Sequence, residues 1–173
     1  MSQVRLFTAT SLDGFVADSD GDSTWLEPYA DSMFGETGFL ESIGAVVLGR
    51  RTFQMMQAFG DWPYDDKFAV IMTSEALTEL PPNATVVTQG IAAAVQLARE
   101  RTSKDIWIVG GAITMQSAIE AGLVDIVEIC IAPKLIGSGL SMLNSLDKRQ
   151  HLEFEGIQAF SDGLVKLRYE AIQ

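Results

Sequence analysis

The stretch Ile106–Ile129 constrains the fold of this chain more than any other. It begins with four apolar residues that run directly into the glycine pair Gly110-Gly111. Such a short apolar run is typical of a strand that is buried on both faces of a parallel sheet. A helix is then expected from about Ala112, with one apolar side and with Gly122 at its end. A second apolar strand over Val124–Ala132 completes a strand–turn–helix–strand unit.

The glycine pair is compatible with two interpretations. Neither glycine has a side chain, so the turn brings bare backbone N–H groups close to anything that lies above the sheet. The helix that follows points its free N–H groups and its partial positive charge at the same place, which suits a phosphate group. The alternative is a turn that only lets helix and sheet pack closely. The stretch alone does not decide between phosphate binding and packing.

Composition limits the kind of protein. With 173 residues, of which 47% are hydrophobic and 20% charged, the chain is expected to form a single packed domain over residues 1–173. A net charge of −11 disfavours nucleic-acid and anionic-membrane partners, because both would be repelled. The only cysteine, Cys130, excludes an intrachain disulfide. Since neither a signal-like segment nor an 18-residue apolar run occurs, we expect a soluble, cytoplasmic protein.

The remaining apolar runs predict alternating strands and helices, and therefore an α/β fold with a mainly parallel sheet covered on both faces. The expected strands are Val4–Ser11, Ala45–Leu48, Phe68–Met72 and Thr85–Thr88. The expected helices are Tyr29–Ser42, a piece from about Thr52 to Ala58, and Ile91–Arg101. A hairpin is expected at the end of the chain, with arms Leu152–Phe160 and Leu164–Ile172, because Ser161-Asp-Gly163 is a turn signal and apolar residues alternate with charged ones in the second arm.

Three of the predicted strands end in polar or glycine-rich groups. These groups are Gly49–Thr52, Thr73–Ser74 and Gly110–Gly111. Ligands of parallel sheets bind beyond the carboxyl ends of the strands. The three groups are therefore expected to converge on one crevice if their strands are neighbours in the sheet.

Several kinds of catalytic site are not indicated. His151 is the single histidine and lies outside the strand-end groups, so it is expected to be a surface residue. Cys130 lies in an apolar run and is expected to be a core residue rather than a nucleophile. With one histidine and one cysteine, no zinc or other metal site is expected. The chain lacks a Gly-x-Ser-x-Gly elbow and a P-loop, and its Gly-Gly turn does not match the Gly-x-Gly-x-x-Gly fingerprint.

The strand-end groups instead carry residues that suit phosphates. Arg50 and Arg51 follow a glycine, and arginine is suited to bidentate phosphate contacts, although both could simply be solvated. Thr52 offers a hydroxyl group at the start of a helix. Thr73 and Ser74 could bind a further phosphate or could cap a helix. A redox dinucleotide fits this pattern, because the cofactor itself carries the reaction.

The sequence resembles the dihydrofolate-reductase-like superfamily, in particular the branch that contains the reductase domain of riboflavin biosynthesis, the RibD C-terminal domain. The resemblance rests on four stretches in the family's order, namely Thr10-Ser-Leu-Asp-Gly-Phe-Val-Ala17, Val47-Leu-Gly-Arg-Arg-Thr-Phe53, Ile108-Val-Gly-Gly111 and Ala132-Pro-Lys-Leu-Ile-Gly-Ser-Gly139. It implies a three-layer sandwich, with a central, mostly parallel sheet, helices on both faces and a C-terminal antiparallel hairpin.

The resemblance also implies a function and a set of site residues. The function is NADPH-dependent reduction of a small molecule, a pyrimidine- or pterin-like heterocycle, similar to the reaction of 5-amino-6-(5-phosphoribosylamino)uracil reductase. By resemblance, the residues that hold the adenosine phosphates are Gly49, Arg50, Arg51, Thr52, Thr73 and Ser74. Those at the pyrophosphate are Gly110, Gly111, Ala112 and Ile113, and those that line the nicotinamide are Ala9, Val16 and Ala17. The family also suggests a homodimer.

The chain departs from its relatives where the substrate would bind. Dihydrofolate reductases carry an acid after the first loop, and the matching position here is Met33, so Asp31 and Glu36 are the nearby candidates for a proton donor, besides water. Phe15 replaces the lysine that is usual in the riboflavin-pathway enzymes. Dihydrofolate reductase activity and a non-catalytic NADP-binding role are therefore kept as alternatives. Asp13 is interpreted as a turn-forming residue rather than a site residue.

Overall fold

The computed structural model of the protein describes residues 2–35, 38–147 and 149–172. The strands are β1 (Val4–Ser11), β2 (Phe15–Ala17), β3 (Ile43–Gly49), β4 (Phe68–Met72), β5 (Ala84–Val87), β6 (Asp105–Gly110), β7 (Ile126–Ala132), β8 (Leu140–Ser141), β9 (His151–Ala159) and β10 (Val165–Ile172). The helices are the 3-10 helix η1 (Thr24–Tyr29), the π-helix η2 (Asp31–Gly35), α1 (Phe39–Ser42), α2 (Arg50–Ala58), α3 (Ile91–Arg101) and α4 (Ala112–Glu120).

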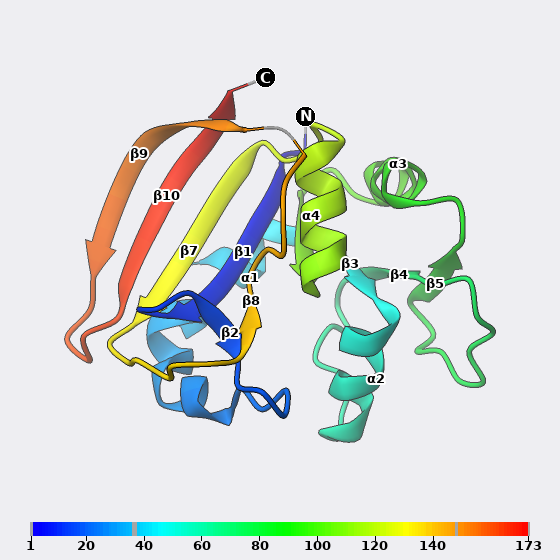
Figure 1. Cartoon of the computed structure of the whole chain (residues 1–173). Helices are drawn as coiled ribbons and strands as arrows, with labels where there is room; N and C mark the ends of the chain where they lie inside the picture. Colours follow the sequence, from blue (N-terminus) through cyan, green and yellow to red (C-terminus); the bar gives the residue numbers. More distant parts are fainter. Residues whose placement is uncertain (1, 36–37, 148, 173) are drawn as a thin grey trace.

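The main sheet confirms the predicted topology. In the described part of the chain it has eight strands in the order β5-β4-β3-β6-β1-β7-β10-β9 (Figure 1). All neighbours from β5 to β7 are parallel, whereas β10 is antiparallel to both β7 and β9. The C-terminal hairpin therefore extends a parallel sheet by two strands. β2 and β8 form a separate small antiparallel sheet, which the sequence pattern did not indicate.

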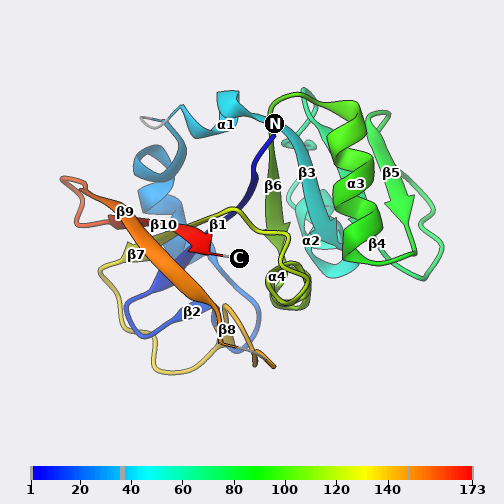
Figure 2. The same cartoon turned by 90° about the horizontal axis from the view of Figure 1, so that it is seen from above.

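Successive residues of the central strands point to opposite faces, and each face is covered by helices. Ile106 and Ile108 pack in a cluster with side chains of α3 and α4. Trp107, between them, packs on the other face with Phe39 of α1 and Phe53 of α2. Figure 2 shows α4 and α1 on opposite sides of β1 and β6. The central strands are continuous apolar runs because both of their faces are buried.

The segment Tyr29–Ser42 does not form the single helix that was predicted. Its described residues belong to η1, η2 and α1, which are three short pieces of different helix type. Pro28 lies inside η1, and Gly38 precedes α1 with a φ of 59°, which is a left-handed conformation. Pro28, directly before the segment, and Gly38, within it, are each incompatible with one continuous α-helix. Within the described residues, no helix is long and apolar enough to cross a membrane.

A buried ion cluster lies on the face of the sheet that carries α1, and we call Arg5, Glu128, Lys166 and Arg168 the Glu128 cluster. Glu128 is 1% exposed and accepts hydrogen bonds from Arg5 Nε at 2.9 Å and Nη2 at 2.6 Å. Its other oxygen lies 2.9 Å from Lys166 Nζ and 3.3 Å from Arg168 Nη1. Burial alone would raise the pKa of Glu128, but the bonds from Lys166 and Arg5 outweigh it and hold the pKa below its ordinary value.

Candidate functional site

The three strand-end groups lie side by side, as predicted. The strands that carry them, β4, β3 and β6, are consecutive in the sheet. Gly49 is in register with Met72 at the end of β4, and Leu48 is in register with Gly110 at the end of β6. The carboxyl ends of these strands therefore form one edge, at which α2 and α4 begin (Figure 1).

The glycines at this edge allow two helix termini to approach each other. A Cβ atom on Gly49 would lie 2.9 Å from Thr114 Oγ1 of α4, and one on Gly111 would lie 3.4 Å from Thr52 Oγ1 of α2. Gly110 has a φ of 130°, and a Cβ atom there would lie 2.9 Å from the Met115 side chain. The Gly110-Gly111 peptide bond is cis. Side chains at these positions would fill the space between the two helices.

The amino termini of α2 and α4 are open to an anion. Their N-cap residues are Gly49 and Gly111, and neither terminus has a side-chain capping bond. The first N–H groups of each helix consequently lack the acceptor that a serine or aspartate cap would supply. Ala112 is half-buried and Ile113 is 73% exposed, so the first turn of α4 reaches the surface. Two such termini around one glycine turn suit a pyrophosphate group.

The predicted adenosine-phosphate residues surround the start of α2. Arg51 is exposed, whereas Arg50 Nη1 forms an ion pair with Glu75 Oε2. Thr73 Oγ1 accepts a hydrogen bond of 3.0 Å from the backbone N–H of Glu75. Ser74 is exposed. Residues 73–83, all of which are described, contain no helix, so the alternative that Thr73 and Ser74 cap a helix is wrong.

The first loop is held against the glycine-rich loop that follows β7. Asp13 Oδ1 accepts a hydrogen bond of 3.2 Å from Ile136 N, and its Oδ2 accepts one of 2.7 Å from Gly137 N. A 2.6 Å hydrogen bond from Ser11 Oγ is the main reason why the pKa of Asp13 is lowered. A Cβ atom on Gly139 would lie 2.1 Å from Ala17 O. Asp13 is therefore more than the local turn-forming residue that was predicted. It connects two loops, because its partners Ile136 and Gly137 lie 123 and 124 residues further along the chain.

The residues predicted to line the nicotinamide lie on β1 and on the small sheet. Ala9 of β1 is half-buried and packs on the cluster that contains Trp107. Val16 is half-buried and Ala17 is buried, both on β2. β1 is the direct neighbour of β6, which carries the glycine turn. Ala9 is therefore on the strand next to the one that carries the glycine turn, whereas Val16 and Ala17 belong to the separate sheet that β2 forms with β8.

No contact in the described structure places the predicted proton donors at the carboxyl ends of β3, β4 and β6. Asp31 is exposed on η2, and Glu36 lies outside the described residues. Met33 is 6% exposed, so the position that matches the acid of dihydrofolate reductases is an apolar core position. Trp25 was not among the sequence-based candidates. Its Nε1 is buried and has no acceptor in the described part of the chain. No sequence pattern around Trp25 indicates this.

His151 and Cys130, for which no catalytic role was predicted, are a surface residue and a core residue, as expected. His151 is exposed at the start of β9, an edge strand. Cys130 is fully buried on β7, and burial raises the pKa of its thiol to about 12. A thiol with that pKa is not a nucleophile at neutral pH. Among the described residues, no group of three His, Cys, Asp or Glu side chains could hold a metal ion.

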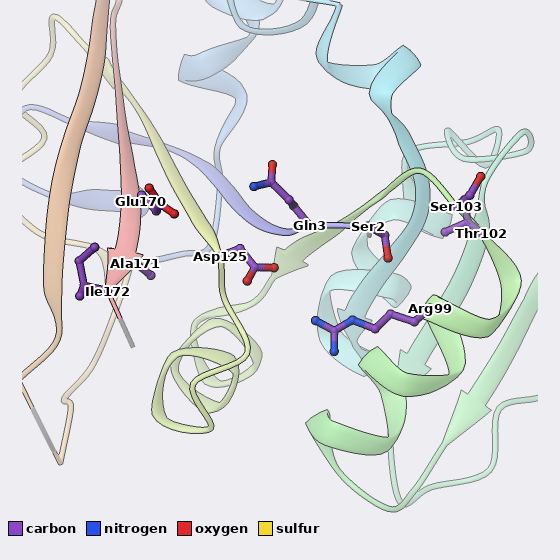
Figure 3. A pocket seen from close by; sticks show the side chains of 9 residues that line it. All are labelled: Ser2, Gln3, Arg99, Thr102, Ser103, Asp125, Glu170, Ala171 and Ile172. Atoms are coloured by element: carbon purple, nitrogen blue, oxygen red, sulfur yellow. The ribbon is translucent and has the colours of Figure 1, made fainter.

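A large depression lies at the opposite edge of the sheet. It has a volume of about 990 Å³ and is open, with Arg99 on one side and Asp125 and Glu170 on the other (Figure 3). It lies at the amino ends of β1 and β6, beside Gln3. Asp125 is engaged within the fold, since its Oδ2 accepts a 2.7 Å hydrogen bond from Val4 N. The depression therefore does not share the strand-end groups that define the candidate site.

Comparisons with known proteins agree with this architecture. The model of the family described as the RibD C-terminal domain matches residues 2–166. The uncharacterized protein YwjB of Bacillus subtilis (strain 168) is 27% identical over 166 residues, which are 95% of this chain and 95% of that protein. A structure of a protein ascribed to riboflavin biosynthesis in Shewanella sp. PV-4 has 26% identity and a TM-score of 0.84 over 99% of both chains.

A dihydrofolate reductase has the same fold. The enzyme from Enterococcus faecalis, solved in complex with NADP(H) and RAB-propyl, has a TM-score of 0.72 and 15% identity, and 99% of this chain and 97% of that chain are covered. At this identity the likeness concerns the fold alone. The predicted dihydrofolate-reductase-like fold is confirmed.

Proposed function

Because the chain belongs to the RibD C-terminal domain family, we propose that it is an NADPH-dependent reductase of a small molecule. The substrate class is a heterocycle related to a pyrimidine or a pterin that carries a reducible C=N or C=O group. The observation that carries the proposal is the convergence of two uncapped helix termini on the Gly110-Gly111 turn, beside Arg50 and Arg51. This arrangement suits a ligand with several phosphate groups.

The residues at the strand ends fit a nicotinamide dinucleotide. The first N–H groups of α4, at Ala112 and Ile113, would hold the pyrophosphate, and the start of α2 with its arginines would hold the adenosine phosphates. That a dihydrofolate reductase of the same fold was solved with NADP(H) supports the choice of cofactor. When bound, the cofactor would supply the hydride. Ala9 and Ala17 have small side chains, which would let the nicotinamide ring lie flat against β1 and β2.

The substrate would lie between the first loop and the short helices that follow it. Phe34 of η2, which is half-buried, packs 5.4 Å from the Phe7 ring and 6.0 Å from the Trp107 ring, measured between centroids, and both of those rings are buried beneath it. The partly exposed Phe34 ring suits contact with a flat heterocycle. The buried Trp25 Nε1 is a donor that a substrate carbonyl would satisfy. Water, Asp31 or Glu36 would supply the proton.

The alternative activities predict different behaviour. Dihydrofolate reductase activity would require an acid elsewhere in the site, because the position of the family's acid is taken here by Met33, a buried apolar residue. A non-catalytic NADP-binding protein would bind the cofactor but would not oxidise it, whichever heterocycle is added. Measuring cofactor binding before substrate turnover therefore separates the alternatives.

The first experiment is thermal unfolding with NADPH, with NADH and without ligand. A ligand at about 100 times its Kd stabilises by roughly 2.7 kcal/mol, which for a domain of this size raises Tm by about 5 to 11 °C. We expect this shift with NADPH and its loss in the double variant Arg50→Glu, Arg51→Glu, because two phosphate contacts become repulsive. The control is Arg99→Glu, Arg149→Glu, which changes the net charge equally.

Two results would contradict the proposal. If neither dinucleotide raises Tm, the chain does not bind the cofactor. If NADPH stabilises the Arg50→Glu, Arg51→Glu variant as much as the wild type, the phosphates bind elsewhere. When binding is established, loss of NADPH absorbance in the presence of pyrimidine and pterin heterocycles, including dihydrofolate, tests the reaction and its substrate class.

A further inference from the structure

Glu75 holds two of the groups that would otherwise face a phosphate. Its carboxylate forms an ion pair with Arg50, the first residue of α2. Its backbone N–H donates to Thr73 Oγ1 at 3.0 Å, which fixes the short turn after β4. The turn and the ion pair together place a negative charge at the edge where the adenosine end of a dinucleotide would bind.

The ion pair is accessible to solvent, so a ligand can compete for it. The Arg50 side chain is 33% exposed and the Glu75 side chain 62% exposed. Exposed ion pairs contribute little to stability, and a phosphate with about two negative charges is a stronger partner for arginine than a carboxylate. Arg50 can therefore exchange Glu75 for a phosphate group.

The two common nicotinamide cofactors differ at this end only. NADPH carries a 2′-phosphate on its adenosine ribose, whereas NADH carries a 2′-hydroxyl there. An arginine is a good partner for the 2′-phosphate, whereas a carboxylate is repelled by it. Arg50 and Glu75 are one residue of each kind, and they are in contact.

We propose that Glu75 weakens the preference of this protein for NADPH over NADH, because it competes with the 2′-phosphate of NADPH for Arg50. The proposal rests on the proposed function, since it assumes that the adenosine end of a dinucleotide lies at the start of α2. Glu75 lowers the affinity for NADPH and leaves the affinity for NADH nearly unchanged. The preference for NADPH is therefore smaller than two adjacent arginines, Arg50 and Arg51, would produce alone.

The test compares Kd values for Glu75→Gln and the wild type at low ionic strength. The ligands are NADPH, NADH, adenosine 2′,5′-bisphosphate and 5′-AMP, so that the 2′-phosphate is tested with and without the nicotinamide. We expect Glu75→Gln to bind NADPH and the bisphosphate about threefold to tenfold more tightly, while NADH and 5′-AMP change by less than about twofold. The gain should shrink as salt is added, because the groups are exposed. The control, Glu153→Gln, removes one carboxylate on β9, the outermost strand on the side of the sheet away from β4.

A double-mutant cycle identifies the partner of Glu75. In an Arg50→Gln background, Glu75→Gln should improve NADPH binding much less than in the wild type, because the competition no longer exists. Equal effects of Glu75→Gln on NADPH and NADH, no effect on either, or an undiminished effect in the Arg50→Gln background would each overturn the proposal alone. Failure of the wild type and of Glu75→Gln to bind any of the four ligands would instead overturn the proposed function, and this proposal with it.

Discussion

The substitution Glu128→Gln removes the one negative charge that the Glu128 cluster is built around. Glu128 is 1% exposed, and the cations next to it, Arg5 and Lys166, are 8% and 7% exposed. The substitution keeps the shape of the side chain but removes the one anionic partner that buried Lys166 has among the described residues, and it leaves Arg5 only its 3.4 Å contact with Asp105. Breaking a buried ion pair in this way destabilises a protein by about 3 to 5 kcal/mol. For a domain of this size, that corresponds to a fall in Tm of about 6 to 20 °C.

The assay is urea unfolding followed by a spectroscopic signal, together with the Tm, for the wild type, Glu128→Gln and Glu155→Gln. Glu155 is the matched control, because it accepts a 2.6 Å hydrogen bond from Arg168 at the rim of the same network but its side chain is 35% exposed. An ion pair at that exposure contributes about 0 to 1 kcal/mol. A loss below about 1 kcal/mol for Glu128→Gln, or equal losses for the two variants, would refute the argument from burial.

Acid and a second substitution test the same argument independently. The pKa of Glu128 is held below its ordinary value of 4.5, so its contribution to stability is fully present above pH 4.5 and is lost as the pH falls through the lowered pKa. The stability difference between wild type and Glu128→Gln should shrink accordingly in acid. Adding Lys166→Met to Glu128→Gln should restore part of the stability, because it removes a buried, unpaired cation. Further destabilisation by Lys166→Met would contradict this account.

Other features lead to predictions at single residues. Asp13→Asn should lower the protection factors (intrinsic divided by observed exchange rate) of the amides at the start of the glycine-rich loop. Because the pKa of Asp13 is lowered, these protection factors should fall in the wild type, but not in the variant, once the pH drops through that pKa; unchanged protection would mean that other contacts hold the two loops together. Cys130 should react with a thiol reagent at pH 8 only as fast as the protein unfolds, because burial raises the pKa of its thiol to about 12, and fast labelling of the folded protein would be inconsistent with that. Trp25→Phe should raise KM for a carbonyl substrate with little change in Tm, and an unchanged KM would remove Trp25 from the site. Ile157 on the edge strand β9 is 65% exposed, so if the predicted homodimer forms through this strand, Ile157→Asp should yield monomers in analytical ultracentrifugation.

The central strands and long helices could be predicted from the sequence because one physical requirement determines each of them. A strand buried on both faces must be a continuous apolar run, and Phe68–Met72 and Ile106–Val109 are such runs. The Ala-rich amphipathic pattern of Ile91–Arg101 predicted α3 with its observed bounds. The convergence of the strand-end groups followed from the rule for parallel sheets, once β4, β3 and β6 proved to be neighbours.

The hairpin shows why a pattern can predict an element and leave its environment open. Apolar and charged residues alternate in β10, which predicts a strand with two different faces. In such a pattern the charged face is usually exposed, yet Lys166 is 7% exposed, because Glu128 on the neighbouring strand neutralises it and its Nζ lies 5.2 Å from the centre of the Phe7 ring. On β9, the apolar Ile157 is 65% exposed. The partners come from β1 and β7, and no local pattern contains that information.

The contacts of Glu75 and Asp13 could not be predicted for the same reason. The contact between Glu75 and Arg50 joins residues 25 positions apart, and the contacts of Asp13 join residues more than 120 positions apart. Both depend on which loops the fold brings together. The segment after the first loop was mispredicted for a local reason, since Pro28 and Gly38 limit the regular helix that its apolar residues favour.

The position of β1 in the sheet has a consequence for how the protein is made. β1 ends at Ser11, but its neighbours are β6, which begins at Asp105, and β7, which ends at Ala132. A ribosome that adds 5 to 20 residues per second leaves the first strand without those neighbours for roughly 5 to 20 s. During that time β3 and β4 emerge as apolar strands with which β1 could pair wrongly. β1 can therefore take its place in the centre of the sheet only after β7 has been synthesised, and the yield of folded protein should depend on how well β1 is kept unpaired until then.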